Sequence, residues 1–350
     1  MRVECKLPHA TQNWDSPIDF GSWNCTGSLL GCGKIRKGVQ IFRPFQDSIA
    51  AYIPVQQDHH VTDALFMPKD ANLMVVSSRS RRSFLWSSLN DPEMDDYVKV
   101  WDVEAEKVTK KYKFKGVVKK LAASTSLPNQ FWFNVDRKAQ KIAEVDTRSP
   151  SFKFIKLKQL HRKHVNFVNW RSFDVNPVDE RTIAVGDLDK LLFYDRRTMS
   201  SSKILEPTKT VDVSSLNSFA SFIVNVKYDP SGNKLIVTNS LSFNIQQYVA
   251  PSAGTSVENI RPLLLGNQTG TFTKNPKFLG EKHVLFDTEF GNCSVVFNLE
   301  DARYVGSIKM IGKNNFFTTN RNIPHPFYCL IASTNRDEIS FITLSSSDVN

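Results

Sequence analysis

Glycine and proline are sparse in this sequence, at 15 and 16 of 350 residues, which excludes a collagen-like or low-complexity chain. Long apolar runs are missing as well, since no stretch approaches the ~18 apolar residues of a membrane-spanning helix. The first residues, MRVECKLPHATQNWD, lack the apolar segment of a signal peptide. We therefore expect a protein of the nucleus or the cytoplasm with no membrane partner.

Cysteine is scarce and shows no paired spacing. A zinc ribbon or a disulfide framework would need closely spaced pairs such as Cys-x-x-Cys, and the five cysteines form none. A phosphate-binding loop is also missing, because Gly33-Lys34 is followed by Ile35 instead of Ser or Thr. The sequence contains no Gly-x-Ser-x-Gly elbow either. These absences predict a protein that is not an enzyme and that binds no cofactor and no metal. The cysteines are Cys5, Cys25, Cys32, Cys293 and Cys329.

What the sequence does contain favours β-strands, with 25 Phe, 8 Tyr and 6 Trp. One pattern recurs seven times along the chain: an apolar strand, a strand of small residues, a polar turn, and a third strand that ends in an aromatic residue and Asp or an equivalent. The segment YVKVWDVEAEKV shows it most clearly, with Trp101-Asp102 at the strand end. The third strands are predicted to end near Phe42, Trp101, Val145, Tyr194, Tyr248, Asn298 and Thr343.

On these features the whole chain resembles the WD-repeat propeller family, although only one repeat contains a true Trp-Asp. The resemblance implies an all-β fold: a single seven-bladed β-propeller of four-stranded antiparallel blades over residues 1–350. Residues 1–7 form a lone predicted strand and the last repeat lacks a fourth strand, so the N-terminal strand is expected to close the ring. The family implies a non-enzymatic scaffold that binds other proteins in a multi-subunit complex.

Two consecutive repeats end their third strands in Asp-x-Arg, at Asp146 to Arg148 and at Asp195 to Arg197, 49 residues apart. This pair resembles the tandem Asp-x-Arg boxes of WD-repeat substrate receptors of cullin-4 ubiquitin ligases. In that family the arginines face the propeller adaptor, and a planar, permanently charged guanidinium suits such contacts. The alternative is that each Asp caps a β-turn and that the Arg is only a surface residue.

The second repeat exceeds the usual blade length by about fifteen residues, which predicts an inserted loop at residues 79–95. Long loops on a rigid scaffold often carry binding residues, and Arg and aromatic side chains are favoured at interfaces. The loop is therefore a second candidate partner-binding surface. The alternative is a hairpin in which opposite charges neutralise each other. The candidate residues are Arg79, Arg81, Arg82, Phe84 and Trp86.

The net charge of +10 leaves a different function open, that of a scaffold in a nuclear complex that contacts nucleic acid or chromatin. Its predicted contacts are the lysines of the third repeat region, which would form a stripe facing phosphates. Alternation in KKYKFKG places lysines on one face of an edge strand, and the alternative is that they serve only to prevent strand-to-strand aggregation. The lysines are Lys110, Lys111, Lys113, Lys115, Lys119 and Lys120.

Overall fold

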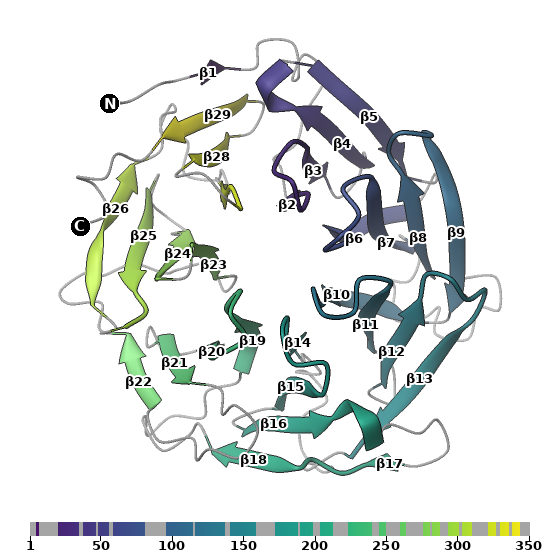
Figure 1. Cartoon of the computed structure of the whole chain (residues 1–350), viewed down its shortest axis with the longest axis vertical. Helices are drawn as coiled ribbons and strands as arrows, with labels where there is room; N and C mark the ends of the chain where they lie inside the picture. Colours follow the sequence, from purple (N-terminus) through teal and green to yellow (C-terminus); the bar gives the residue numbers. More distant parts are fainter. Residues whose placement is uncertain are drawn as a thin grey trace.

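In the residues that it describes, the computed structural model consists mainly of β-strands, and Figure 1 shows them around a common centre. Of the helices it describes, η1 (Pro44–Gln46) and η4 (Arg196–Thr198) have three residues each, and none is long and apolar enough to cross a membrane. The structure describes residues 5–6, 20–34, 38–46, 48–55, 59–80, 96–114, 116–136, 141–158, 172–187, 190–198, 204–212, 223–239, 245–249, 260–263, 276–280, 282–287, 293–300, 303–309, 321–326, 330–335 and 338–343.

These residues form seven sheets, numbered here in chain order. The first contains β2 (Phe20–Trp23), β3 (Leu30–Lys34), β4 (Gly38–Arg43) and β5 (Ser48–Pro54). The second contains β6 (His59–Phe66), β7 (Leu73–Ser80), β8 (Asp96–Asp102) and β9 (Lys107–Phe114). The third contains β10 (Val117–Ala123), β11 (Gln130–Asp136), β12 (Lys141–Asp146) and β13 (Phe152–Leu157), and the fourth contains β14 (Phe173–Val175), β15 (Thr182–Asp187), β16 (Lys190–Asp195) and β18 (Lys209–Asp212).

The remaining three sheets complete the circle in Figure 1. The fifth contains β19 (Ile223–Tyr228), β20 (Lys234–Asn239), β21 (Ile245–Val249) and β22 (Ile260–Leu263). The sixth contains β23 (Lys277–Leu279), β24 (His283–Asp287), β25 (Cys293–Asn298) and β26 (Tyr304–Lys309). The seventh contains β27 (Arg321–Pro324), β28 (Leu330–Asn335), β29 (Glu338–Thr343) and β1 (Cys5–Lys6). The fold is thus an all-β propeller with four-stranded antiparallel blades, and every third strand ends at the predicted residue or one residue after it.

One sheet departs from the four-stranded prediction. A two-residue strand, β17 (Ile204–Leu205), lies in the sequence between β16 and β18 of the fourth sheet. It pairs in parallel with β13 of the third sheet. The backbone N–H of Lys158 donates to the Leu205 carbonyl at 3.0 Å. A strand this short has no periodicity to read in the sequence. It covers part of an outer edge that would otherwise present unpaired backbone groups.

The N-terminal and C-terminal ends of the chain meet in the seventh sheet. Strand β1 pairs antiparallel with β29, with Cys5 opposite Phe341, which is the pairing predicted for the N-terminal strand. Side chains of the first and seventh sheets also meet there. The indole N–H of Trp23 donates to the Ile323 carbonyl at 3.0 Å, and the rings of Trp23 and His325 lie 4.7 Å apart in an edge contact.

Apolar residues of neighbouring sheets pack face to face. Val98 and Val100 of β8 lie in one buried cluster with Phe131 and Phe133 of β11, which joins the second sheet to the third. Successive residues of a strand point to opposite faces, so Tyr97, Lys99 and Trp101 lie on the other face of β8. Trp101 packs there against the buried cluster shared with the first sheet. Each sheet therefore buries both faces, and polar side chains remain at the rims and along the outer strands.

Candidate partner-binding rim

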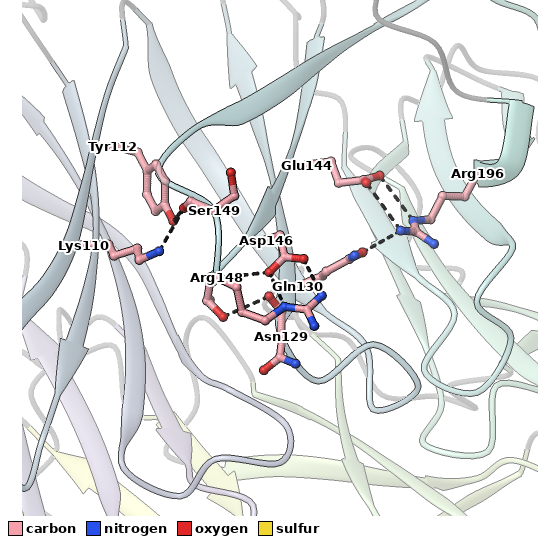
Figure 2. Close-up of polar contacts among 10 residues, drawn as sticks. Lys110, Tyr112, Asn129, Gln130, Glu144, Asp146, Arg148, Ser149 and Arg196 are labelled. Carbon is pink, nitrogen blue, oxygen red and sulfur yellow. Dashed lines mark hydrogen bonds and ion pairs between the residues drawn. The ribbon is translucent and has the colours of Figure 1, made fainter.

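Asp146 and Arg148 form a closed pair at the end of β12. The Arg148 guanidinium donates through Nε to Asp146 Oδ1 at 3.0 Å and through Nη2 to Oδ2 at 2.7 Å (Figure 2). The backbone N–H of Arg148 donates to the same Oδ1 at 2.9 Å. One carboxylate thus fixes both the turn and the side chain that follows it. We call this pair the third-sheet fork.

Asp195 and Arg197 repeat this geometry at the end of β16. Nε of Arg197 donates to Asp195 Oδ1 at 3.1 Å, Nη2 donates to Oδ2 at 2.6 Å, and the backbone N–H donates to Oδ1 at 2.9 Å. We call this pair the fourth-sheet fork. Because β12 and β16 are equivalent third strands of neighbouring sheets, the two forks lie along the same rim. Each Asp therefore caps its turn, as one of the two alternatives predicted, while docking through the arginines stays a prediction.

In both forks the Asp side chain is mostly buried and the Arg side chain is exposed. The Arg148 and Arg197 side chains are 69% and 61% exposed, whereas those of Asp146 and Asp195 are 28% and 21% exposed. The hydrogen bonds from Arg148 lower the pKa of Asp146 to about 2, and Arg197 likewise lowers the pKa of Asp195. Each guanidinium spends two of its five N–H donors on its Asp, so the outer donors can bind the backbone carbonyls of a partner.

Residues from the second sheet support the third-sheet fork. Lys110 Nζ and the Tyr112 hydroxyl donate to the Ser149 carbonyl at 3.1 and 3.2 Å, directly after Arg148 (Figure 2). The Thr147 backbone N–H donates to the carbonyl of Asn129, the residue directly before β11, at 2.8 Å, which ties the same turn to the third sheet. Lys110 was predicted to contact nucleic acid. In the structure its ammonium group is instead hydrogen-bonded to this turn.

Arg196, the middle residue of the fourth-sheet fork, has a role that the sequence did not reveal. Its guanidinium reaches back to the third sheet, where Nη2 donates to Gln130 Oε1 at 2.6 Å and Nε donates to Glu144 Oε2 at 3.3 Å (Figure 2). It also lies 5.7 Å from the Trp132 ring. Arg196 and Glu144 are 18% and 20% exposed. This bridge fixes the position of one fork relative to the other.

Most of the predicted insertion lies outside the described residues, including Arg81, Arg82, Phe84 and Trp86. Arg79 does not belong to a loop, because it lies in β7, opposite His60 of β6. The pairing of β7 continues to Ser80, whose backbone N–H donates to Asp96 at 2.9 Å. The predicted start of the loop at Arg79 is therefore corrected to a position after Ser80.

The predicted lysine stripe divides into separate groups. Lys111 and Lys113 are exposed on β9, and Tyr112 and Phe114 between and after them are buried, as the alternation predicted. Lys115 and the side chain of Lys119 lie outside the described residues. Lys110 is bonded to the turn at Ser149. Lys111 and Lys113 are therefore the exposed members of the stripe in the described part of the chain.

Lys120 lies on β10 among the innermost strands and is not a surface contact. Its ammonium donates to Asn225 Oδ1 at 2.9 Å and to the Val226 carbonyl at 2.8 Å, both on β19. Burial lowers the pKa of Lys120 to about 8. Asp63 of β6 accepts the Leu121 backbone N–H at 2.7 Å beside it. Lys120 is therefore corrected from a nucleic-acid contact to an internal bond between inner strands.

Metal-binding chemistry has no support in the described ranges, where no three His, Cys, Asp or Glu side chains come together to hold an ion. Cys32 is a buried free cysteine of the first sheet, and burial raises the pKa of its thiol. Cys25 is also free and partly buried.

The ring of sheets defines a β-propeller. A solved structure with this fold is the β-propeller domain of Cps50 (Swd1) from Myceliophteria thermophila, with a TM-score of 0.67 over 98% of this chain and 100% of that chain, at 13% sequence identity. Likeness at such identity shows the fold alone. Because 1551 chains of solved structures match, the architecture is shared too widely to specify a partner. No protein-family profile and no curated protein matches the sequence.

Proposed function

We propose that this chain is a non-enzymatic interaction scaffold, and more specifically a substrate receptor that docks on the adaptor of a cullin-4 ubiquitin ligase through Arg148 and Arg197. We also propose a ring of seven blades, one for each sheet, which gives the receptor a fixed rim for docking. Such a receptor would work in the nucleus or the cytoplasm, the location that we propose for it.

The observation that carries this proposal is the identical geometry of the two forks. Asp146 and Asp195 each hold the arginine two residues later through Nε and Nη2, and both of these arginines stay more than half exposed. A turn cap needs only the bond to the backbone N–H, so the side-chain bonds point to a further use. Two pre-aligned guanidinium groups lose little side-chain entropy when they bind a partner.

An affinity pull-down from cell extract with mass spectrometry tests the proposal, comparing the wild type with the Arg148→Ala, Arg197→Ala double variant. The cullin-4 adaptor is expected with the wild type and should be lost with the variant, which should remain folded because both side chains are exposed. A matched control is Lys153→Ala with Lys156→Ala, which removes two exposed charges from β13. Adaptor capture that is absent, or equal in all three proteins, would reject docking through the forks.

The inserted segment remains the proposed substrate-binding surface. Deleting residues 81–94 should abolish substrate capture while the thermal unfolding midpoint and adaptor binding stay unchanged, because β7 keeps Ser80 and the fork residues lie in other sheets. Full substrate capture by the deletion would reject this assignment. The two assays separate loss of substrate from loss of the ligase.

Nucleic-acid binding is the alternative function, and its residue set is now smaller. Lys110 and Lys120 are engaged within the protein, so a continuous phosphate-facing stripe has lost two of its members. If nucleic acid were the partner, affinity would fall steeply between low and moderate salt because counterions are released. An affinity that stays flat with salt would reject this alternative.

A further inference from the structure

Two lysines lie directly opposite each other on the face of the second sheet that turns toward the first. Lys99 of β8 is paired with Lys111 of β9. Like charges in directly opposite positions of neighbouring strands destabilise a sheet. Lys99 is partly buried, and burial together with the Lys111 charge lowers its pKa. In the described part of the chain neither lysine forms an ion pair with a carboxylate. The repulsion between these two positive charges therefore destabilises the sheet.

The ammonium groups of Lys111 and of nearby Lys113 lie close to the ring of Tyr97. Lys111 Nζ lies 3.8 Å from the centroid of the Tyr97 ring, and Lys113 Nζ lies 5.8 Å from it. Cation–π attraction holds an ammonium group over such a ring. Tyr97 itself is 8% exposed, so its position is fixed by packing. The ring of His59 from β6 lies 5.6 Å from the Tyr97 ring on the same sheet.

We propose that Lys99 and Lys111, with Lys113 beside them around Tyr97, bind a phosphorylated side chain of a protein partner. A phosphate monoester carries close to two negative charges at neutral pH and three acceptor oxygens. Placed near both ammonium groups, it relieves their repulsion and forms charge-assisted hydrogen bonds. The repulsion between Lys99 and Lys111 raises the free energy of the unbound protein. A compact dianion that removes this repulsion therefore binds more tightly.

A phosphorylated side chain fits these residues better than a nucleic-acid strand does. Single strands are bound largely by stacking bases on exposed aromatic rings, and Tyr97 is buried. A strand also needs a row of free cations, whereas Lys110 and Lys120 are bonded within the protein. What remains is a compact cluster around one ring, which matches a single phosphate group.

This site is separate from the two forks. Lys99 lies three residues before Asp102, the end of the third strand in the second sheet, which is about 10 Å along a strand. The forks lie at the ends of the equivalent strands in the third and fourth sheets. Phosphate binding at Lys99 and Lys111 therefore neither requires nor excludes adaptor docking at Arg148 and Arg197.

The test uses the full chain and a fluorescent peptide pool with a central phosphoserine in randomised flanks, beside the same pool with serine. Fluorescence anisotropy should show that the wild type binds the phosphoserine pool about tenfold or more tightly than the serine pool. Lys99→Gln with Lys111→Gln should remove this preference. Lys153→Gln with Lys156→Gln, which loses the same charge from exposed positions of β13, should keep it.

Two outcomes of the binding test would overturn the proposal: no preference for phosphoserine in the wild type, or an equal loss in both double variants. A third arm adds a single-stranded DNA of about 20 nucleotides. Tighter binding of this DNA, lost with Lys99→Gln and Lys111→Gln, would assign the lysines to nucleic acid instead.

Thermal unfolding separates a binding role from a structural one. The Lys99→Gln, Lys111→Gln protein should unfold at the same temperature as the wild type or higher, because a like-charge pair has been removed. The phosphoserine pool should raise the unfolding temperature of the wild type alone. A clearly lower temperature for the double variant would show that the lysines stabilise the fold, and would overturn the proposal. None of these readouts depends on the cullin-4 adaptor.

Discussion

The guanidinium of Arg196 lies against the carboxylate of Glu144, and this contact crosses from the fourth sheet to the third. Nε of Arg196 is 3.3 Å from Glu144 Oε2, in a region where both side chains are largely buried. The next residue, Arg197, is exposed and bonded to Asp195 within its own turn. The two adjacent arginines thus have different roles: Arg196 joins the two sheets, and Arg197 faces solvent.

This difference predicts unequal effects of two neighbouring substitutions. Arg196→Ala should lower the free energy of unfolding by about 1–3 kcal/mol, because it leaves Glu144 and Gln130 partly buried without their donor. Arg197→Ala should change it by about 0.5 kcal/mol or less, as expected for an exposed position. Urea unfolding of both variants measures the two values. Equal losses would contradict the assignment of Arg196 as the bridge between sheets.

Gly232 predicts a second stability difference. It lies in the turn between β19 and β20 with a φ of 72°, and its carbonyl accepts a hydrogen bond from Asn176 Nδ2 at 2.9 Å. A Cβ at this position would collide with the Asn176 side chain. Gly232→Ala should therefore cost about 2–4 kcal/mol, the sum of left-handed strain and the displaced Asn176.

Gly280 offers a matched control for this substitution. Its φ is 62°, and a Cβ there would meet no atom within 4 Å. Gly280→Ala should cost only the conformational strain, about 1–2 kcal/mol. The comparison is made by thermal or urea unfolding of both variants. A loss at Gly232 no larger than at Gly280 would show that the contact with Asn176 adds nothing.

The repeat and its strand ends could be predicted because their signals are local. Trp101-Asp102 and Tyr194-Asp195 each mark a third strand, and both strands end there. Residues 229–233 have the sequence Asp-Pro-Ser-Gly-Asn, which favours a tight turn between strands, and Gly232 has a positive φ there. The forks followed from a spacing of one repeat, although their docking role is still a prediction.

The errors arose where the environment of a side chain depends on another sheet. Lys110 and Lys120 were grouped with Lys111 because all three lie in one basic stretch. Lys120 belongs to an inner strand and bonds to β19, more than a hundred residues away. Arg196 resembled a surface residue inside Asp-x-Arg, and nothing local links it to Glu144. Contacts between sheets are set by the ring, which no short pattern encodes.

The lowered pKa of Lys120 predicts a pH dependence of stability. Its pKa falls from an ordinary value of 10.5 to about 8 in the folded protein, mainly because of burial. Between these two values the unfolded chain keeps the proton that the folded protein has released. The unfolded state thus binds more protons, so this group raises stability as pH increases.

Lys120→Met isolates this contribution. From about pH 8 to about pH 10 the free energy of unfolding of the wild type should rise relative to that of the variant, by up to about 1 kcal/mol per pH unit. Urea unfolding at several pH values measures the difference, in which groups common to both proteins, such as Tyr228, cancel. A difference that is constant with pH would contradict a buried ammonium at this position.

The pairing of β1 with β29 predicts that the first residues stabilise the whole ring. Deleting residues 1–6 would expose the outer edge of β29 and remove the backbone bonds at Cys5 and Lys6, which should lower the unfolding temperature and promote association through the open edge. Replacing Cys5 with Val and Lys6 with Thr keeps the strand and should retain stability, because backbone groups form the pairing. Differential scanning calorimetry and light scattering measure both effects. If the deletion and the replacement behave alike, the contacts of Trp23 with Ile323 and His325 are sufficient to join the first and seventh sheets.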